Sequence, residues 1–297
     1  MRGRRDCIGA IGAAIGVAAG AAPVSAQSAW AGLPAEFARI ERREGGRLGV
    51  AVLDLGHRRA AEHRSGDRFP MASTFKMLAA GAVLARIDAG QDSLDRRIRF
   101  GRGDLVTYSP VTEGQVGGEG MTVAALLEAM MTLSDNTAAN LLLTAIGGPE
   151  GLTAFLRRHG DAVTRLDRME TALNEARPGD PRDTTSPAAM LATMRALTLG
   201  EVLSAASRAR LVALMEGNRV SGGLFRARLP QGWRIGDRSG AGGFNTRGIA
   251  AVIWPSGGQA PLLVTAYLAE GPQQTLAARD AVLAEVAAAI FTAYGAG

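Results

Sequence analysis

The chain has 297 residues, a length that allows one or two domains with a well-packed core. Hydrophobic residues make up 47% of the chain and charged residues 21%, which excludes a disordered or collagen-like protein. The formal net charge is +5, from 33 basic and 28 acidic residues, and Lys76 is the single lysine among the 33.

The same inventory excludes several kinds of site. The three histidines form neither H-x-H nor H-E-x-x-H, and the P-loop and G-x-S-x-G patterns do not occur. The densest group of arginines, at 96–102, contains one interleaved aromatic residue, Phe100. We interpret that group as a solvated surface, and we predict no nucleic-acid partner, no metal and no cofactor.

Residues 1–26 are typical of a signal peptide. Three arginines precede an apolar run over 8–22, which is shorter than the roughly 20 residues that span a membrane. The small residues 24–26 predict cleavage, with a mature chain that starts near Gln27 and has lost Cys7, the one cysteine. We therefore expect a periplasmic or secreted protein that leaves the membrane after cleavage. A retained membrane anchor is the alternative, and both the general and the twin-arginine export routes stay open.

After this segment, strand and helix patterns occur at both ends of the chain. Alternating or continuous apolar runs predict strands at 47–55, 60–69, 233–241, 248–254 and 261–269. Amphipathic patterns predict helices at 34–44 and 275–294. We predict an α+β fold in which an antiparallel sheet and its terminal helices form one lobe, from 27–70 and 217–297, around an inserted all-α lobe, 71–216.

The inserted lobe carries clear helix boundaries. A helix is predicted at 121–133, and Ser134-Asp135 can cap the next helix, which ends at Gly147. Ser186 is an expected N-cap because a proline follows it at the first helical position. The stretch 165–185 has no clean periodicity and many charges, which predicts a long functional loop.

The single lysine points to chemistry. Arginine keeps its proton in proteins, whereas a desolvated lysine can act as a base. Ser73 opens an apolar run with helical period, which predicts a helix from this residue, and Lys76 follows it by three residues. On such a helix the two side chains share one face, and a serine hydroxyl needs such a neighbouring base to become a nucleophile. The S-x-x-K pattern alone also fits a helix-capping serine with a surface lysine.

Three further segments favour the catalytic interpretation. Ser134-Asp135-Asn136, Glu170 with Asn174, and Arg238-Ser239-Gly240 follow in that order. S-x-x-K, S-D-N and K-T-G are known signatures of serine β-lactamases. With these motifs and stretches such as LVTYSPVTEG, the sequence closely resembles the class A serine β-lactamases over about residues 34–294.

The resemblance implies a set of catalytic roles. Ser73 would open the lactam and become the acyl-ester, with Lys76 or Glu170 as the base for acylation. Ser134 would pass a proton to the departing ring nitrogen. Glu170 and Asn174 would hold and activate the water that cleaves the acyl-enzyme.

It also implies binding roles. Asn136 would bind the side-chain amide of the substrate, Arg238, Ser239 and Arg247 its carboxylate, and Tyr108 would line the entrance. The backbone amides of Ser73 and Ala241, which follows Gly240, would form the oxyanion hole. Arg168 and Asp183 would be the ion pair that closes the long loop.

Two positions depart from the family pattern. Arg238 replaces the usual lysine of the third motif and resembles the carbenicillin-hydrolysing subgroup, so we predict penicillins, including carboxypenicillins, as substrates. Thr171 follows Glu170 where many relatives carry proline after a cis bond. Either the loop keeps a cis bond here or its backbone differs.

The expected activity is hydrolysis of small β-lactam molecules by a monomeric enzyme. A penicillin-binding transpeptidase or carboxypeptidase, and a non-catalytic β-lactam sensor, are the alternatives. Glu170 and Asn174 favour hydrolysis, because only rapid deacylation needs a positioned water.

Overall fold

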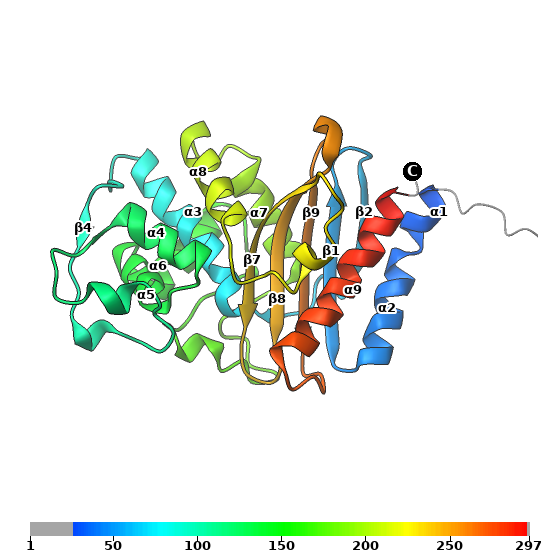
Figure 1. The fold of residues 1–297 in the computed structure, drawn as a ribbon, viewed down its shortest axis with the longest axis horizontal. Coiled ribbons are helices and arrows are strands. Elements are labelled where there is room, and N and C mark those ends of the chain that lie inside the picture. The colour runs from blue at the N-terminus through cyan, green and yellow to red at the C-terminus, as the bar shows by residue number, and fades with distance from the viewer. Residues whose placement is uncertain (1–25, 296–297) are drawn as a thin grey trace, which may run out of the picture.

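The computed structural model describes residues 26–295, so most of the predicted signal peptide lies outside the described residues. A five-stranded antiparallel sheet with the order β2-β1-β9-β8-β7 forms the centre (Figure 1). Its strands are β1 Arg47–Asp54, β2 Arg59–His63, β7 Arg234–Ala241, β8 Arg247–Trp254 and β9 Leu262–Ala269. The predicted α+β class and antiparallel sheet are confirmed.

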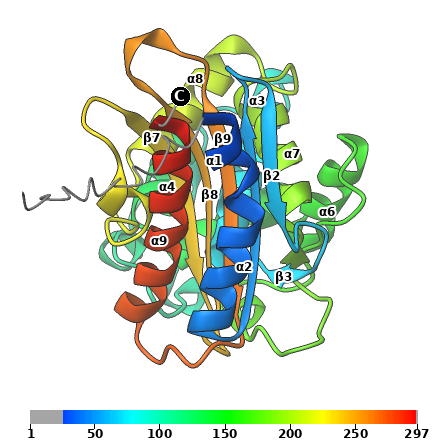
Figure 2. The same ribbon diagram turned by 90° about the vertical axis from the view of Figure 1, so that its right-hand side faces the viewer.

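Three helices from the two ends of the chain cover one face of the sheet, as Figure 2 shows. They are α1 Ala26–Ala31, α2 Leu33–Glu44 and α9 Leu276–Gly295. The remaining helices lie on the other side: α3 Phe75–Asp88, α4 Val123–Thr132, α5 Asn136–Ala145, α6 Gly148–Arg158, α7 Pro187–Thr198 and α8 Ala205–Glu216. Short strand pairs join β3 Phe69–Pro70 to β6 Thr184–Thr185 and β4 Arg97–Ile98 to β5 Met121–Thr122.

The central strands are buried on both faces. Along β8, Ile249, Ala251 and Ile253 belong to the hydrophobic cluster under α2 and α9, whereas Ala250 and Val252 belong to the cluster of the other helices. Successive side chains of a strand point to opposite faces, so a sheet covered on both sides needs continuous apolar strands. These two clusters lie on opposite faces of one sheet, and the division of the chain into two lobes stays a prediction.

Helix α3 lies at the centre of the hydrophobic cluster on the face of the sheet away from α2 and α9. Every residue from Phe75 to Leu84 is buried, which is typical of a helix surrounded by protein. Lys76 is part of this buried run, and its charged group must therefore find partners inside the protein.

Three predicted boundaries were wrong. The second strand ends at His63 instead of continuing to residue 69, because Arg64 adopts a left-handed conformation (φ 44°) and turns the chain out of the sheet. The helix expected from residue 121 begins at Val123, because Thr122 pairs in β5 and accepts a hydrogen bond from the amide of Ala125 at its N-cap.

The third difference concerns Ser73, which lies in a 3₁₀ turn, Ala72–Thr74, directly before α3. The hydroxyl and the amide of Thr74 both donate to the carbonyl of Met71, at 2.7 and 3.1 Å, and hold the tighter turn. The predicted cap Ser186 does accept a hydrogen bond from the amide of Ala189.

No helix in the described part of the chain combines the length and the apolar character needed to cross a membrane.

The cluster under the terminal helices generates a stability prediction. Phe37 of α2 is fully buried there, whereas Phe244, between β7 and β8, is 51% exposed. We expect Phe37→Ala to lower the free energy of unfolding by about 3–5 kcal/mol, because it leaves a cavity. Phe244→Ala is the matched control, with an expected loss of less than about 1 kcal/mol. Urea denaturation measures both, and equal losses would contradict the packing described here.

Candidate active site

The predicted nucleophile is held by close contact between two elements. Ala72, just before Ser73, has a positive φ of 41°, a conformation that non-glycine residues rarely adopt. Strand β7 passes so close that a Cβ atom at Gly240 would lie 2.7 Å from the carbonyl oxygen of Met71 and 2.8 Å from the amide of Ser73. Only glycine allows this approach, which brings the backbone of β7 against the amide of the predicted nucleophile.

Lys76 follows Ser73 by three residues, in the first turn of α3, and has no exposed surface. Its Nζ atom is 3.1 Å from Oε1 of Glu170, 3.1 Å from Oγ of Ser134 and 2.5 Å from Oδ1 of Asn136. Burial lowers the pKa of Lys76 to about 8, against the opposing charge of Glu170. At pH 7, one unit below this pKa, about a tenth of the amine is neutral.

Two side-chain oxygens approach the hydroxyl of the predicted nucleophile. The Oγ atom of Ser134 donates to Oγ of Ser73 at 3.2 Å, and Oγ of Ser73 lies 3.5 Å from Oε1 of Glu170. The second distance is longer than a normal hydrogen bond, so a proton passes directly only if the groups move closer, or else through a water. Ser134 itself has a left-handed backbone, with φ 63°.

Glu170 is held through its backbone as well as its side chain. Its amide donates to Oδ1 of Asn140 at 2.8 Å, and its carbonyl accepts from Nδ2 of the same residue at 2.9 Å. The Glu170–Thr171 peptide bond is cis, which decides between the two alternatives for this loop. The carboxylate accepts a 2.5 Å hydrogen bond from Nδ2 of Asn174, whose Oδ1 is buried and has no partner within the described residues.

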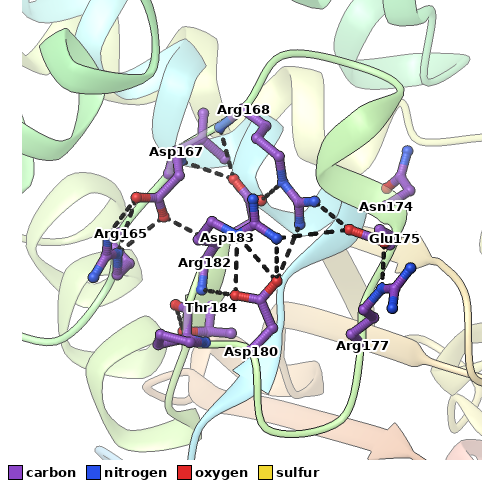
Figure 3. A network of polar contacts seen from close by, with 12 residues as sticks. Arg165, Asp167, Arg168, Asn174, Glu175, Arg177, Asp180, Arg182, Asp183 and Thr184 are labelled. Atoms are coloured by element: carbon purple, nitrogen blue, oxygen red, sulfur yellow. Dashed lines mark hydrogen bonds and ion pairs between the residues drawn. The ribbon is translucent and has the colours of Figure 1, made fainter.

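A charge network closes the loop that carries Glu170 (Figure 3). Nε of Arg168 lies 2.6 Å from Oδ2 of Asp183, and Oδ1 of Asp183 accepts from the amides of Asp167 and Arg168. Nη1 of Arg168 also pairs with Glu175 at 2.6 Å. Further pairs join Arg165 to Asp167, Arg177 to Glu175 and Arg182 to Asp180. The expected pair between Arg168 and Asp183 is thus the centre of a larger network.

A cleft of about 280 Å³ opens above these groups. It is lined by Ser73, Tyr108, Ser134, Asn136, Asn174, Arg238, Ser239, Gly240, Ala241 and Arg247, together with Val220 and Leu276. Tyr108 is 54% exposed at its edge. Lys76 and Glu170 lie below the lining residues, so the structure brings all twelve of these predicted residues to one place.

The two predicted carboxylate-binding arginines are fixed on β7 and β8. Arg238 is buried, and its Nε donates to the carbonyl of Ser73 at 3.2 Å while Nη1 donates to the carbonyl of Met131 at 3.1 Å. Burial lowers the pKa of Arg238 to about 10. Arg247 lies 2.6 Å from Asp280 of α9 and also donates to the carbonyl of Gly240.

Known proteins have a similar fold and a related sequence. A family model described as "Beta-lactamase enzyme family" matches residues 33–294. The ancestral class A β-lactamase GNCA is 59% identical, with a TM-score of 0.85, and the match covers 88% of this chain and 99% of that chain. A class A β-lactamase of the last common ancestor of Gram-negative bacteria, GNCA4, is 58% identical, with a TM-score of 0.86 and coverage of 89% and 99%.

The chain belongs to the class A serine β-lactamases. A third solved structure agrees: PenP of Rhodopseudomonas palustris, provisionally described as a class A β-lactamase, is 55% identical over 88% of this chain and 99% of that chain, with a TM-score of 0.85. As a member of this family, the protein is a hydrolase that opens β-lactams.

Sequence reasoning missed two residues of the β-lactamase site. Asn140 lies four residues after Asn136 on α5, so helical spacing was a usable signal that both share one face. Asp280 is 33 residues from Arg247 and belongs to the terminal helix, and no local pattern connects the two. A larger hollow of the β-lactamase, about 640 Å³, lies along α8, beside the end of α3, and is lined by other residues, such as Ile87 and Leu214.

The two hydrogen bonds of Asn140 generate a prediction. We expect Asn140→Ala to lower kcat for benzylpenicillin roughly a hundredfold, since a displacement of about 1 Å at a reacting group has that effect. The free energy of unfolding should fall by about 1–3 kcal/mol. Thr144→Ala, one turn along the same helix, is the control and should leave kcat unchanged. Steady-state kinetics decide, and an unaltered kcat in Asn140→Ala would show that the backbone of Glu170 needs no such support.

Proposed function

We propose that this β-lactamase hydrolyses penicillins through an acyl-enzyme on Ser73. The observation that carries the proposal is that Ser134 and Glu170 both contact its hydroxyl, while the amine of Lys76 bonds to each of these two residues. The Oγ atom of Ser73 attacks the lactam carbonyl and loses its proton to Lys76 or Glu170. The C–N bond then breaks, and the ring nitrogen takes a proton through Ser134.

The second half of the reaction depends on Glu170 and Asn174. Glu170 takes a proton from a water that attacks the ester carbon, and the proton then returns to Ser73 as the ester bond breaks. The buried Oδ1 atom of Asn174 supports this role, because it offers such a water an acceptor that no described residue occupies. The amides of Ser73 and Ala241 would stabilise the oxyanion in both halves.

Five residues that line the cleft would recognise the substrate. Arg238, Ser239 and Arg247 would bind the carboxylate of the penicillin nucleus, and Asn136 and Tyr108 its side chain. The bonds of Arg238 within the described protein involve Nε and Nη1. That leaves the donors of Nη2 for a ligand, which supports carboxylate binding. Because Arg238 also resembles the carbenicillin-hydrolysing subgroup, we propose carboxypenicillins among the substrates.

We also propose that the enzyme works as a monomer in the periplasm or outside the cell after export. The support for export is the sequence pattern of residues 1–26 together with the 97–99% coverage of relatives that match only 88–89% of this chain.

Two variants test the acyl-enzyme. Ser73→Ala should lower benzylpenicillin turnover by roughly 10⁴–10⁶-fold and show no adduct by mass spectrometry. Glu170→Ala should give a burst followed by accumulation of an acyl adduct on Ser73, because deacylation loses its base. Full steady-state turnover by Glu170→Ala would remove that residue from its role, and an adduct elsewhere would exclude Ser73.

The pH dependence of acylation tests which base acts. If Lys76 is the base, its neutral form is required, and with a pKa of about 8 the acylation rate should fall by about tenfold per pH unit below that value. It should level off at higher pH. Pre-steady-state burst kinetics with benzylpenicillin between pH 6 and 9 measure this rate. A rate that stays constant between pH 6 and 8 would assign the proton to Glu170 instead.

Arg238→Lys tests the carboxypenicillin assignment. Lysine keeps the charge but loses the planar pair of donors, so kcat/KM for carbenicillin should fall about tenfold further than kcat/KM for benzylpenicillin. Parallel steady-state assays with the two substrates measure the difference. Equal effects on both would discard the proposed preference.

A further inference from the structure

A second cluster of buried polar groups lies behind Arg238, outside the catalytic cleft. Asp237 precedes Arg238 on β7, and both side chains are buried, at 0% and 1% exposure. Neighbouring residues of a strand point to opposite faces, but β7 is the edge strand of the sheet. A residue placed beyond that edge can therefore contact both side chains.

Asn218, just after α8, is that residue. Its Nδ2 donates to Oδ2 of Asp237 at 3.0 Å, and its Oδ1 accepts from Nη1 of Arg238 at 3.4 Å. The same Oδ1 accepts from the amide of Val220, at 3.1 Å, and Val220 lines the catalytic cleft. Asn218 is 5% exposed and does not itself line the cleft.

The orientation of this amide follows from the charges around it. Nε of Arg226 donates to Oδ1 of Asp237 at 2.7 Å, which favours the charged carboxylate despite the burial that raises the pKa of Asp237. Oδ2 of the same carboxyl group accepts from Nδ2 of Asn218, so the NH₂ group of Asn218 faces Asp237. The oxygen of Asn218 is thereby directed toward Arg238.

The guanidinium of Arg238 is thus held on three sides. Nε is bonded to the carbonyl of Ser73, and Nη1 is shared between the carbonyl of Met131 and Asn218. Among these acceptors, Asn218 is the only side chain. A substitution cannot remove the two backbone carbonyls. It can remove the contact with the side chain of Asn218.

We propose that Asn218, oriented by Asp237 and Arg226, is a positioning residue that sets Arg238 for the carboxylate of the substrate. The inference rests on the proposed role of Arg238 in carboxylate binding. It assigns to Asn218 no contact with the substrate, so its effect must appear only where the substrate offers a negative charge.

The test compares benzylpenicillin with its methyl ester, which lacks that charge, and measures kcat/KM for each. Asn218→Leu keeps the size of the side chain but removes its acceptor. The ratio of acid to ester should fall about tenfold, the effect of one hydrogen bond to a charged group. Asn218→Gln keeps both the donor for Asp237 and the acceptor for Arg238, so it should lose less of the ratio than Asn218→Leu does.

Two further variants separate the possible outcomes. Ser221→Ala is the control, because Ser221 accepts from Asn218 and Arg226 but does not contact Arg238, and it should leave the ratio unchanged. Arg238→Gln should lower the ratio at least as far as Asn218→Leu does. Thermal melting of every variant confirms that it is folded, and Asn218→Ala repeats the comparison if the leucine variant does not fold.

An equal fall for acid and ester in Asn218→Leu would overturn the inference, because it would show a purely structural role. An unchanged ratio in Arg238→Gln would overturn the proposed role of Arg238 itself, and is a distinct result. A loss of ratio in Arg238→Gln without any loss in the Asn218 variants would leave the proposed function intact and reject the positioning role.

Discussion

The buried contact between Lys76 and Glu170 is the constraint on which the rest of the structure depends. The two charged groups lie 3.1 Å apart with no exposed side-chain surface. Removing both from water costs several kcal/mol per ion unless each finds well-placed partners. Ser134 and Asn136 supply partners for the amine, and Asn174 supplies one for the carboxylate. The catalytic groups thus supply one another with the polar contacts that water would otherwise make.

This constraint explains why the long loop is so densely bonded. Glu170 comes from a segment with little regular structure, yet its carboxylate must stay within reach of a helix buried in the core. Asn140 fixes its backbone from α5, and the network around Arg168 and Asp183 closes the loop. Exposed ion pairs contribute little each, but Asp183 is 1% exposed and also accepts two backbone amides, which makes this pair a structural element.

Arginine and lysine have different roles in this enzyme. Arginine serves wherever a permanent charge binds carbonyls or carboxylates, as at Arg168, Arg238 and Arg247. The one lysine stands where burial can bring the pKa to about 8. The choice between the two cations therefore follows the chemistry: planar donors for binding, and an amine that can lose its proton beside the nucleophile.

Local sequence determined much of this protein. Apolar runs, caps such as Ser186 and the helical spacing of Ser73 and Lys76 rest on contacts between residues near in the chain, so they placed the main elements and paired these two side chains. The resemblance to the class A serine β-lactamases supplied the other expected residues of the cleft. Tertiary structure decided the rest. The close approach of Gly240 to the amide of Ser73, the partnership of Arg247 with Asp280 and the place of Asn218 between Asp237 and Arg238 arise where distant segments meet. Such contacts leave no periodic pattern in the sequence, because they depend on how distant segments pack in three dimensions.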